Sequence, residues 1–240
     1  EKHIVRWIAE NPFSEGIGWE SYPLSLRVVN WIKWAWLNKD TNLKGFDKSL
    51  ALQINYLYKN LEYHLLGNHL LENAKALIFG GCYFQGKNSK KWLNKGLKIL
   101  LKELKEQILD DGGHFELSPM YHILIFELVL DLLALTKDIN SPKKLCDCRD
   151  ELEFYAKKMS LWLEVMSYPN DELPNFNDSS NNIAPSPKAI QNFFQNLTTF
   201  DDALPFFGSK FLSSSGYLRM QNKSALVIFD IAQIGAKYLP

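Results

Sequence analysis

Apolar residues recur at helical spacing along most of the chain. Between residues 21 and 38 they cover nearly the whole circumference, which is typical of a buried helix, with Ser21 as its cap and Pro23 in its first turn. Amphipathic patterns predict six further helices, over residues 46–66, 68–79, 89–109, 119–136, 148–166 and 187–197. Gly80 and Gly81 are expected to end the second of these, and Ser118 is expected to cap the helix that starts at Pro119.

The pattern changes twice in the last third of the chain. Residues 167–186 form a long stretch poor in helix formers, and such loops in compact domains are usually functional or disordered. Further on, alternation replaces the helical period, and residues 216–221 and 224–231 predict a β-hairpin. The helices could bury their inner faces in an α/α barrel, an α-solenoid or an irregular bundle. The lack of a repeat of fixed period favours a toroid or an irregular bundle.

Composition limits the classes of function. Among 240 residues, 27 Lys and Arg balance 27 Asp and Glu, so the net charge offers no general attraction to nucleic acid or to an anionic membrane. The three cysteines fit neither a disulfide framework nor a zinc site. No run of about 18 uncharged apolar residues predicts a membrane span. The sequence begins at Glu1 without Met and without a signal peptide, which suggests a fragment, so the location of the protein cannot be read directly from it. The oligomeric state is also unknown from the sequence.

The first candidate site is the polar doublet of Asn68 and His69 at the start of an apolar helix. On that helix His69 shares a narrow stripe with Glu72 and Asn73, opposite an apolar face. Two interpretations stay open. In the first, Asn68 is a helix cap and His69 an ordinary first-turn residue; in the second, the doublet carries chemistry, and Asn68 can do both.

The second candidate site is the segment "GGHFELSPMYH". His114 and Glu116 lie in its loop, and Tyr121 and His122 lie in the first turn of the next helix, so several titratable groups are expected at one helix mouth. Tyr121 also shares its face with leucine and isoleucine side chains, as a core tyrosine would. A buried tyrosine still needs a partner for its hydroxyl.

Five segments together resemble one known family. They are "GWESYPLSLRVVNWI" (18–32), "GNHLLENAKAL" (67–77), "DGGHFELSPMYH" (111–122), "LPNFNDS" (173–179), and "SSGYLRM" with "LVIFD" near the end. In this order they cover most of the chain and are similar to the heparinase II/III-like polysaccharide lyases, which include heparin, heparan and alginate lyases.

The resemblance implies a mainly α fold with two domains. An incomplete (α/α) toroid of antiparallel helical hairpins is expected over residues 1–205, and the first strands of an antiparallel β-sandwich over residues 206–240, with the sugar chain in the cleft between them. Family members continue into a Gly-His-x-His-x-Asp segment with a metal-site or active-site histidine, which this sequence lacks. No cofactor or metal ligand is therefore expected in this chain, and a divalent metal only in the β domain beyond it. The resemblance also suggests a periplasmic or secreted protein.

The same resemblance implies the roles of three residues. A lyase removes the C5 proton of a uronic acid and expels the oxygen at C4. Asn68 would hydrogen-bond to the uronate carboxylate at a positive helix N-terminus and stabilise the enolate-like charge. His69 would act as the base or help neutralise the carboxylate. Tyr121 would donate a proton to the leaving oxygen and, for some substrate stereochemistries, also act as the base, which requires a lowered pKa or a positive neighbour.

Further residues are predicted to contact an anionic polysaccharide or oligosaccharide. They are Trp19, Arg27, Asn30, Glu116, His122 and Asp178. Structural alternatives exist for two of them, because Arg27 could form an internal salt bridge and Asp178 could cap a turn. The chain has only four arginines, which disfavours highly sulfated heparin as the substrate.

Two other functions fit the same helical fold. A glycoside hydrolase would place an acid and a base or nucleophile around the glycosidic bond, and Asp110, Asp111, Glu116 and Asp178 are available for this. A carbohydrate-binding or assembly protein could keep the fold without the reaction. The products separate the enzymes, since only a lyase leaves an unsaturated uronide that absorbs ultraviolet light.

Overall fold

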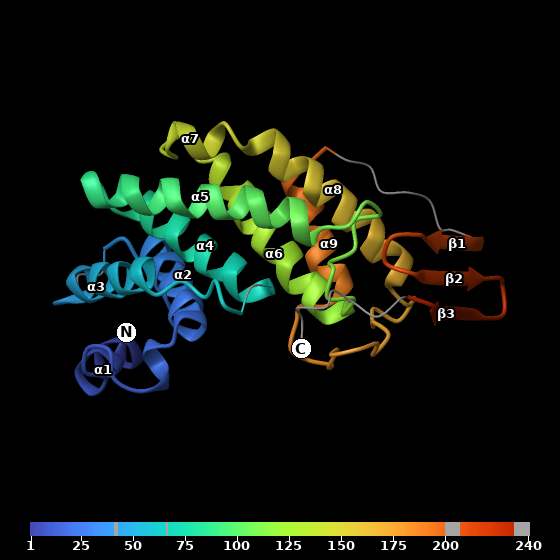
Figure 1. The fold of residues 1–240 in the computed structure, drawn as a ribbon, viewed down its shortest axis with the longest axis horizontal. Coiled ribbons are helices and arrows are strands. Elements are labelled where there is room, and N and C mark those ends of the chain that lie inside the picture. The colour runs from blue at the N-terminus through green and yellow to red at the C-terminus, as the bar shows by residue number, and fades with distance from the viewer. Residues whose placement is uncertain (41–42, 66, 200–206, 233–240) are drawn as a thin grey trace. The chain divides into compact units, whose positions relative to one another are not determined.

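The computed structural model describes residues 1–40, 43–65, 67–199 and 207–232 (Figure 1). The chain divides into an N-terminal unit, Glu1–Glu103, and a C-terminal unit, Leu104–Pro240. The N-terminal unit contains α1 (Lys2–Glu10), the 3₁₀-helix η1 (Ile17–Trp19), α2 (Ser21–Leu37), α3 (Phe46–Lys59), α4 (Gly67–Tyr83) and most of α5 (Lys87–Gln107). The C-terminal unit contains α6 (Pro119–Thr136), α7 (Lys143–Cys146), α8 (Arg149–Met166), α9 (Pro187–Leu197), β1 (Gly208–Leu212), β2 (Tyr217–Gln221) and β3 (Leu226–Asp230).

The core of the N-terminal unit forms where α2 and α3 pack against α4. Of residues 67–81 in α4, every one except His69 is buried, including Glu72 and Asn73. The predicted separation into a polar and an apolar face is therefore wrong for this helix. The Asn73 side chain makes three hydrogen bonds inside the unit, which allows it to be buried.

Gly80 and Gly81 lie inside α4 and do not end it. A Cβ at Gly81 would lie 2.7 Å from the Cβ of Leu93 and 3.0 Å from its backbone N and Cα, and a Cβ at Gly80 would lie 2.7 Å from Cδ1 of Ile54. On α5, a Cβ at Gly96 would lie 2.8 Å from the carbonyl oxygen of Ala74. These glycines serve close helix packing, so the prediction that the pair ends the helix at residue 79 is wrong.

Replacing Gly81 with alanine is expected to lower the free energy of unfolding by about 1–3 kcal/mol, because the new methyl group meets the backbone of α5. Gly80→Ala is the matched control. Its methyl group meets the flexible end of Ile54, which can move aside, so its cost should be smaller. Denaturant unfolding of both variants gives the order, and equal or reversed costs would contradict the packing argument.

Other helix boundaries show which local signals are reliable. The cap position of α2 is Glu20, and Ser21 instead donates from its hydroxyl to the backbone carbonyl of Asn60, so the predicted cap is wrong. α3 ends at Lys59, seven residues earlier than the pattern predicts. The predicted start of α6 is confirmed, because the Ser118 hydroxyl accepts the backbone N–H of Tyr121.

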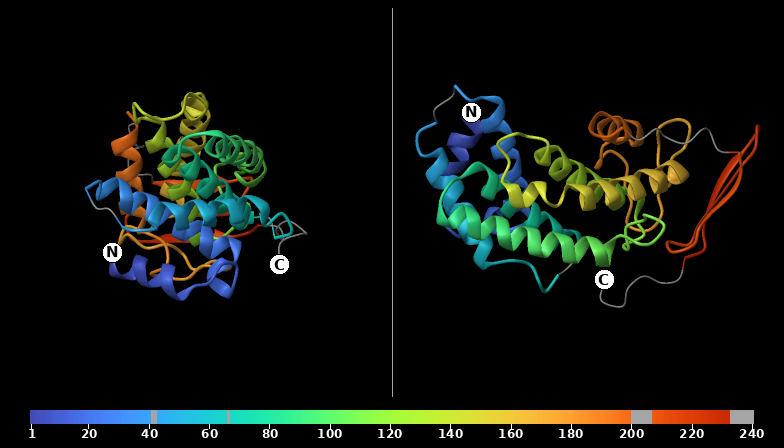
Figure 2. Two further views of the ribbon diagram at one scale, coloured as in Figure 1. Left: turned by 90° about the vertical axis from the view of Figure 1, so that its left-hand side faces the viewer. Right: turned by 90° about the horizontal axis from the view of Figure 1, so that it is seen from above.

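In the C-terminal unit, α6 packs against α8 and α9, and a three-stranded sheet follows (Figure 2). The predicted hairpin is confirmed as antiparallel β2 and β3, and β1 adds a third strand that the sequence analysis did not predict. One face of the sheet packs on the end of α8 in a core of Trp162, Met166, Leu212, Tyr217 and Ile228. The predicted domain boundary at residues 205–206 lies outside the described residues.

α6 is long and apolar enough to cross a membrane by length and composition alone. Most of it is buried against neighbouring elements, as it is in helices of protein cores that meet the same two criteria. No other helix in the described ranges meets them. This is weak evidence for a membrane span.

Candidate active site

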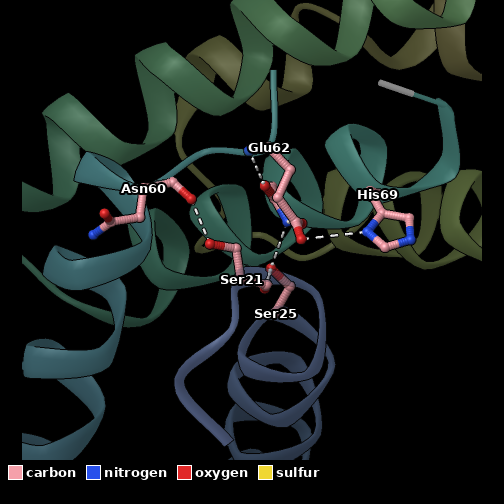
Figure 3. A network of polar contacts seen from close by, with 6 residues as sticks. Ser21, Ser25, Asn60, Glu62 and His69 are labelled. Carbon is pink, nitrogen blue, oxygen red and sulfur yellow. Dashed lines mark hydrogen bonds and ion pairs between the residues drawn. The ribbon is translucent and has the colours of Figure 1, made fainter. Parts of the chain in front are cut away.

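His69 projects from the first turn of α4 and is one of the three residues with an implied catalytic role. Its Nδ1 lies 3.3 Å from Oε1 of Glu62 (Figure 3). The ring of Tyr22 lies against the imidazole at a centroid distance of 4.4 Å. The His69 side chain is 37% exposed, whereas that of Glu62 is 11% exposed. One edge of the imidazole is thus held from inside the unit while part of the ring remains open to a ligand.

Glu62 is held in place by a hydrogen-bond network that includes Asn73. Its backbone N–H donates to Oδ1 of Asn73 at 3.0 Å, and Nδ2 of Asn73 donates to its Oε2 at 2.9 Å. The same Nδ2 donates to the Ser25 hydroxyl at 3.1 Å, and Ser25 donates to the backbone carbonyl of Ser21 at 2.7 Å. Ser21 binds the carbonyl of Asn60, which connects α2, α4 and the segment after α3 (Figure 3).

Glu62 was not predicted as a site residue, because the apolar pattern extends the predicted helix to residue 66. Asn60 follows the last helical residue, and its Nδ2 donates to the backbone carbonyl of Tyr56 at 2.8 Å. Asparagine just after an amphipathic stretch is a helix-ending signal that could have placed Glu62 in a loop.

Asn68 lies within the first turn of α4, because the helix begins at Gly67. It is therefore inside the helix, not at the cap position that one interpretation gave it. Only 8% of Asn68 is exposed. Asn68 and His69 belong to the N-terminal unit, and Tyr121 belongs to the C-terminal unit.

The start of α6 is bound to the loop that contains the "LPNFNDS" segment. The Ser118 hydroxyl lies 2.9 Å from that of Ser179 and donates to the carbonyl of Asp178 at 3.2 Å. The Ser179 hydroxyl accepts the backbone N–H of Met120 at 3.2 Å. Two segments nearly 60 residues apart in sequence therefore form one local structure around the first turn of α6.

Leu117, immediately before the cap of α6, has a left-handed backbone with φ of 56°. This conformation is unfavourable for a residue with a branched side chain. Nδ2 of Asn177 donates to the Leu117 carbonyl at 2.7 Å, and the hydroxyl of Tyr217 on β2 donates to the same oxygen. Nδ2 of Asn177 also lies 3.3 Å from Oδ2 of Asp230. The sheet and the loop together hold the strained turn that leads into Tyr121.

Tyr121 has two acidic neighbours at this helix start. Its pKa is raised above the ordinary tyrosine value, first by partial burial, then by the charge of Asp178, by a hydrogen bond to the Asp178 side chain, and by the charge of Glu116. Each effect favours the neutral phenol. The structure therefore brings together three of the predicted site residues, and it gives Tyr121 the protonation state of a proton donor.

His114 and His122 lie in the core of the C-terminal unit. Nε2 of His122 donates to the carbonyl of Met159 at 3.1 Å, and its ring packs on Trp162 at 4.2 Å. Nε2 of His114 donates to Oε1 of Gln107 at 3.0 Å. Burial lowers the pKa of each histidine to about 3, with the charge of His122 adding to the effect on His114. Both histidines are therefore neutral. Because the His122 side chain is buried, it could influence a substrate only indirectly, by its effect on the position of α6.

Asp111 uses its carboxylate to organise the loop before Tyr121. Oδ2 accepts the backbone N–H groups of Ser214 and Ser215 at 2.9 and 2.7 Å and the Ser215 hydroxyl at 2.9 Å, while Oδ1 accepts the N–H of Gly113 at 3.1 Å. The Ser215 hydroxyl also accepts Nε1–H of Trp162. This set of bonds makes Asp111 a structural residue that links the loop to the turn between β1 and β2.

Asp111→Ala is expected to lower the free energy of unfolding by about 2–3 kcal/mol, because it removes a charged acceptor of four hydrogen bonds. Asp110→Ala, at the exposed neighbouring position, is the matched control and should stay within about 0.5 kcal/mol of the parent protein. Denaturant unfolding measures both. If Asp111→Ala unfolded like the parent protein while losing activity, Asp111 would instead be a hydrolase carboxylate.

The remaining predicted residues lie on or next to α2. Nε of Arg27 donates to Oε1 of Gln53 at 2.7 Å, and its guanidinium lies 3.8 Å from the ring centroid of Trp7. Burial lowers the pKa of Arg27 to about 10. Trp19 is 4% exposed and packs in an aromatic cluster, whereas Asn30 is exposed. Arg27 thus has internal partners other than the acid that the structural alternative expected, and the substrate contacts of all three stay predictions.

Among the residues that the structure describes, no group of three or more His, Cys, Asp and Glu side chains is arranged to hold a metal ion. The metal expected from the resemblance concerns a β-domain segment beyond this sequence. That expectation stays a prediction.

Comparisons with known proteins agree with this architecture. The family model described as Heparinase II/III N-terminus matches residues 7–206. A heparin-sulfate lyase of Pedobacter heparinus is 32% identical over 138 residues, which are 57% of this chain and 20% of that protein. A heparin-sulfate lyase of Bacteroides stercoris is 28% identical over 179 residues, 67% of this chain and 26% of that protein. The chain therefore spans about a quarter or less of these relatives.

A solved structure of Heparinase III matches 95% of this chain and 40% of that chain, with a TM-score of 0.72 and 23% sequence identity. At this identity the likeness concerns the fold. It confirms the predicted fold class, an α-toroid of helical hairpins followed by strands of an antiparallel sheet. Because the family model covers 7–206 of the 240 residues, the chain belongs to the Heparinase II/III N-terminus family.

Proposed function

We propose that this chain is part of a polysaccharide lyase that cleaves uronic-acid-containing polysaccharide by β-elimination. A base takes the C5 proton, the electron pair forms the C4–C5 double bond, and the C4–O bond breaks as its oxygen receives a proton. Asn68 hydrogen-bonds to the uronate carboxylate, where the N-terminus of α4 favours the developing negative charge. Carbohydrate binding and a periplasmic location are part of the same proposal.

The observation that carries the proposal is the surroundings of Tyr121. Asp178 and Glu116 favour the protonated phenol, so Tyr121 is the acid that protonates the leaving oxygen. The role of base then goes to His69, whose Nε2 has no hydrogen-bond partner in the described part of the chain. Of the two roles that the resemblance implies for the tyrosine, the proposal thus gives Tyr121 that of the acid.

The substrate class follows from the curated relatives, which are heparin-sulfate lyases. We assign this chain a glycosaminoglycan of the heparan type. With four arginines in 240 residues, few bidentate partners for sulfate groups are present, which favours a low-sulfated chain over heparin.

The test is a panel of uronic-acid polysaccharides incubated with the full-length protein and followed by ultraviolet absorbance. Heparan sulfate, heparin, hyaluronan and alginate are compared at equal uronate concentration. Growth of absorbance from an unsaturated uronide, fastest with low-sulfated heparan, is expected. New reducing ends without this absorbance would support the hydrolase alternative, and binding without any product would support the non-catalytic one.

A further inference from the structure

Glu62 is a buried carboxylate to which the resemblance gives no role, and it contacts His69 directly. We propose that Glu62 is a positioning residue that fixes the tautomer of His69 and thereby exposes the basic Nε2 to the substrate. The inference rests on the proposed function for the role of His69 as base. The proposed tautomer does not depend on that role.

The contact between Glu62 and His69 defines where the imidazole proton lies. An ionised carboxylate only accepts hydrogen bonds, so the Nδ1 that lies 3.3 Å from Oε1 of Glu62 has to carry the proton in the neutral ring. Nε2 then holds the lone pair. This is the arrangement in which a carboxylate orients the histidine of a Ser-His-Asp triad without itself taking up the proton.

The position of Glu62 does not depend on His69. Its other carboxylate oxygen and its backbone N–H are both bonded to Asn73, at 2.9 and 3.0 Å, and Asn73 is fully buried. Asn73 is bonded in turn to Ser25 on α2. The carboxylate is thus fixed before it meets the imidazole, which is how an orienting residue limits the rotation of its partner.

Tyr22 restricts the ring from a second direction. Its ring lies against the imidazole with an interplanar angle of 31°, so rotation of His69 about its side-chain bonds would break this contact. A carboxylate at one ring edge and an aromatic face beside the ring together leave the Nε2 edge for the substrate. The elements that carry these groups all belong to the N-terminal unit.

The test replaces Glu62 with glutamine in the full-length protein. The amide oxygen can still accept from Asn73, and the amide nitrogen then faces Nδ1 of His69 as a donor. This favours the tautomer with the proton on Nε2, which cannot act as the base. We expect kcat to fall by about 10²-fold or more with KM within about twofold, because only the chemical step loses its base. Glu15→Gln, which neutralises an exposed glutamate in the same unit, should keep the parent kcat.

Nitrogen-15 NMR of labelled histidine shows which ring nitrogen of His69 carries the proton. This would not change if Glu62 only stabilised the fold. The His69 signals, assigned by their absence in His69→Gln, should show a protonated Nδ1 in the parent protein and a protonated Nε2 in Glu62→Gln. A proton on Nε2 in the parent protein would overturn the proposal, whether or not the variant folds. A loss of kcat with an unchanged tautomer would also overturn it. If His69→Gln keeps full activity while the tautomer is as expected, the base assignment fails and the positioning contact stands.

Discussion

Tyr121→Phe is expected to abolish ultraviolet-detected cleavage in the full-length protein while preserving the fold. The substitution removes only the hydroxyl, and loss of a general acid typically costs about 10²–10⁴-fold in rate. Substrate binding should change little, since the phenyl ring keeps the packing of the first turn of α6. Initial rates with heparan sulfate, together with circular dichroism of the variant, measure the two parts of this expectation.

The matched control is Tyr155→Phe, which removes a hydroxyl from a tyrosine on α8 whose pKa is also raised by burial and a nearby acid, Glu151. Its activity should equal that of the parent protein. Parent-like cleavage by Tyr121→Phe would remove Tyr121 from the mechanism. Equal losses in both variants would indicate a general effect of removing a tyrosine hydroxyl.

If Tyr121 is the acid, the pH dependence of activity should shift in a defined direction when Asp178 is replaced. Asp178 favours the protonated phenol, so Asp178→Asn lowers the pKa of Tyr121. If Tyr121 is the acid, the alkaline limb of kcat/KM moves to lower pH and activity is lost there. If Tyr121 were the base, the same variant would gain activity near neutral pH, because more of the phenolate would be present. The pH profile of Asp178→Asn therefore separates the two roles.

Most of the helices could be predicted from the sequence, because each of them buries a stripe or a whole circumference at helical spacing, whereas α1 and the short α7 were not predicted. The start of α6 could also be predicted, since Ser118 and Pro119 are local signals of a helix N-terminus. The end of α4 could not be predicted. A glycine pair is typical of a helix end, but Gly80 and Gly81 are needed here because α4 packs closely on α3 and α5. Only the tertiary contacts tell a packing glycine from a terminating one.

The residues around Tyr121 could be predicted from the sequence, whereas the partner of His69 could not. Tyr121, Glu116 and Asp178 were all named from the sequence, and the structure brings them together at the start of α6. Glu62 was not named, since its role depends on where α3 ends and on a bond to Asn73, eleven positions further along the chain. Hydrogen-bonded partners of this kind carry no periodic pattern in the sequence.

The structure also bears on the hydrolase alternative. A pair of catalytic carboxylates needs free oxygens facing the glycosidic bond. The carboxylate of Asp111 accepts four hydrogen bonds from its own loop and the β1–β2 turn, and Asp178 is bonded to the Tyr121 hydroxyl. Two of the four acidic residues named for a hydrolase therefore have internal partners, which leaves Asp110 and Glu116 for that alternative.

The fold is expected to lose stability steeply in acid because of the two buried histidines. His114 and His122 have pKa values near 3 in the folded state, against about 6.5 when unfolded. The folded values are lowered, so the stabilisation is complete above about pH 6.5 and is lost as the pH falls towards 3. In this window the unfolded chain binds up to two more protons, and the free energy of unfolding should fall by up to about 2.7 kcal/mol per pH unit.

His122→Gln isolates the histidine part of this dependence from that of the carboxylates. The glutamine amide can still donate to the carbonyl of Met159 but cannot be protonated, so the slope between pH 6 and 4 should decrease by about one proton relative to the parent protein. His3→Gln, at an exposed position of α1, is the control and should keep the parent slope. Denaturant unfolding at several pH values, followed by tryptophan fluorescence, to which Trp162 beside His122 contributes, measures the slopes. An unchanged slope in His122→Gln would mean that His122 is already protonated in the folded core, and its bond to Met159 would then have to stabilise the charged ring.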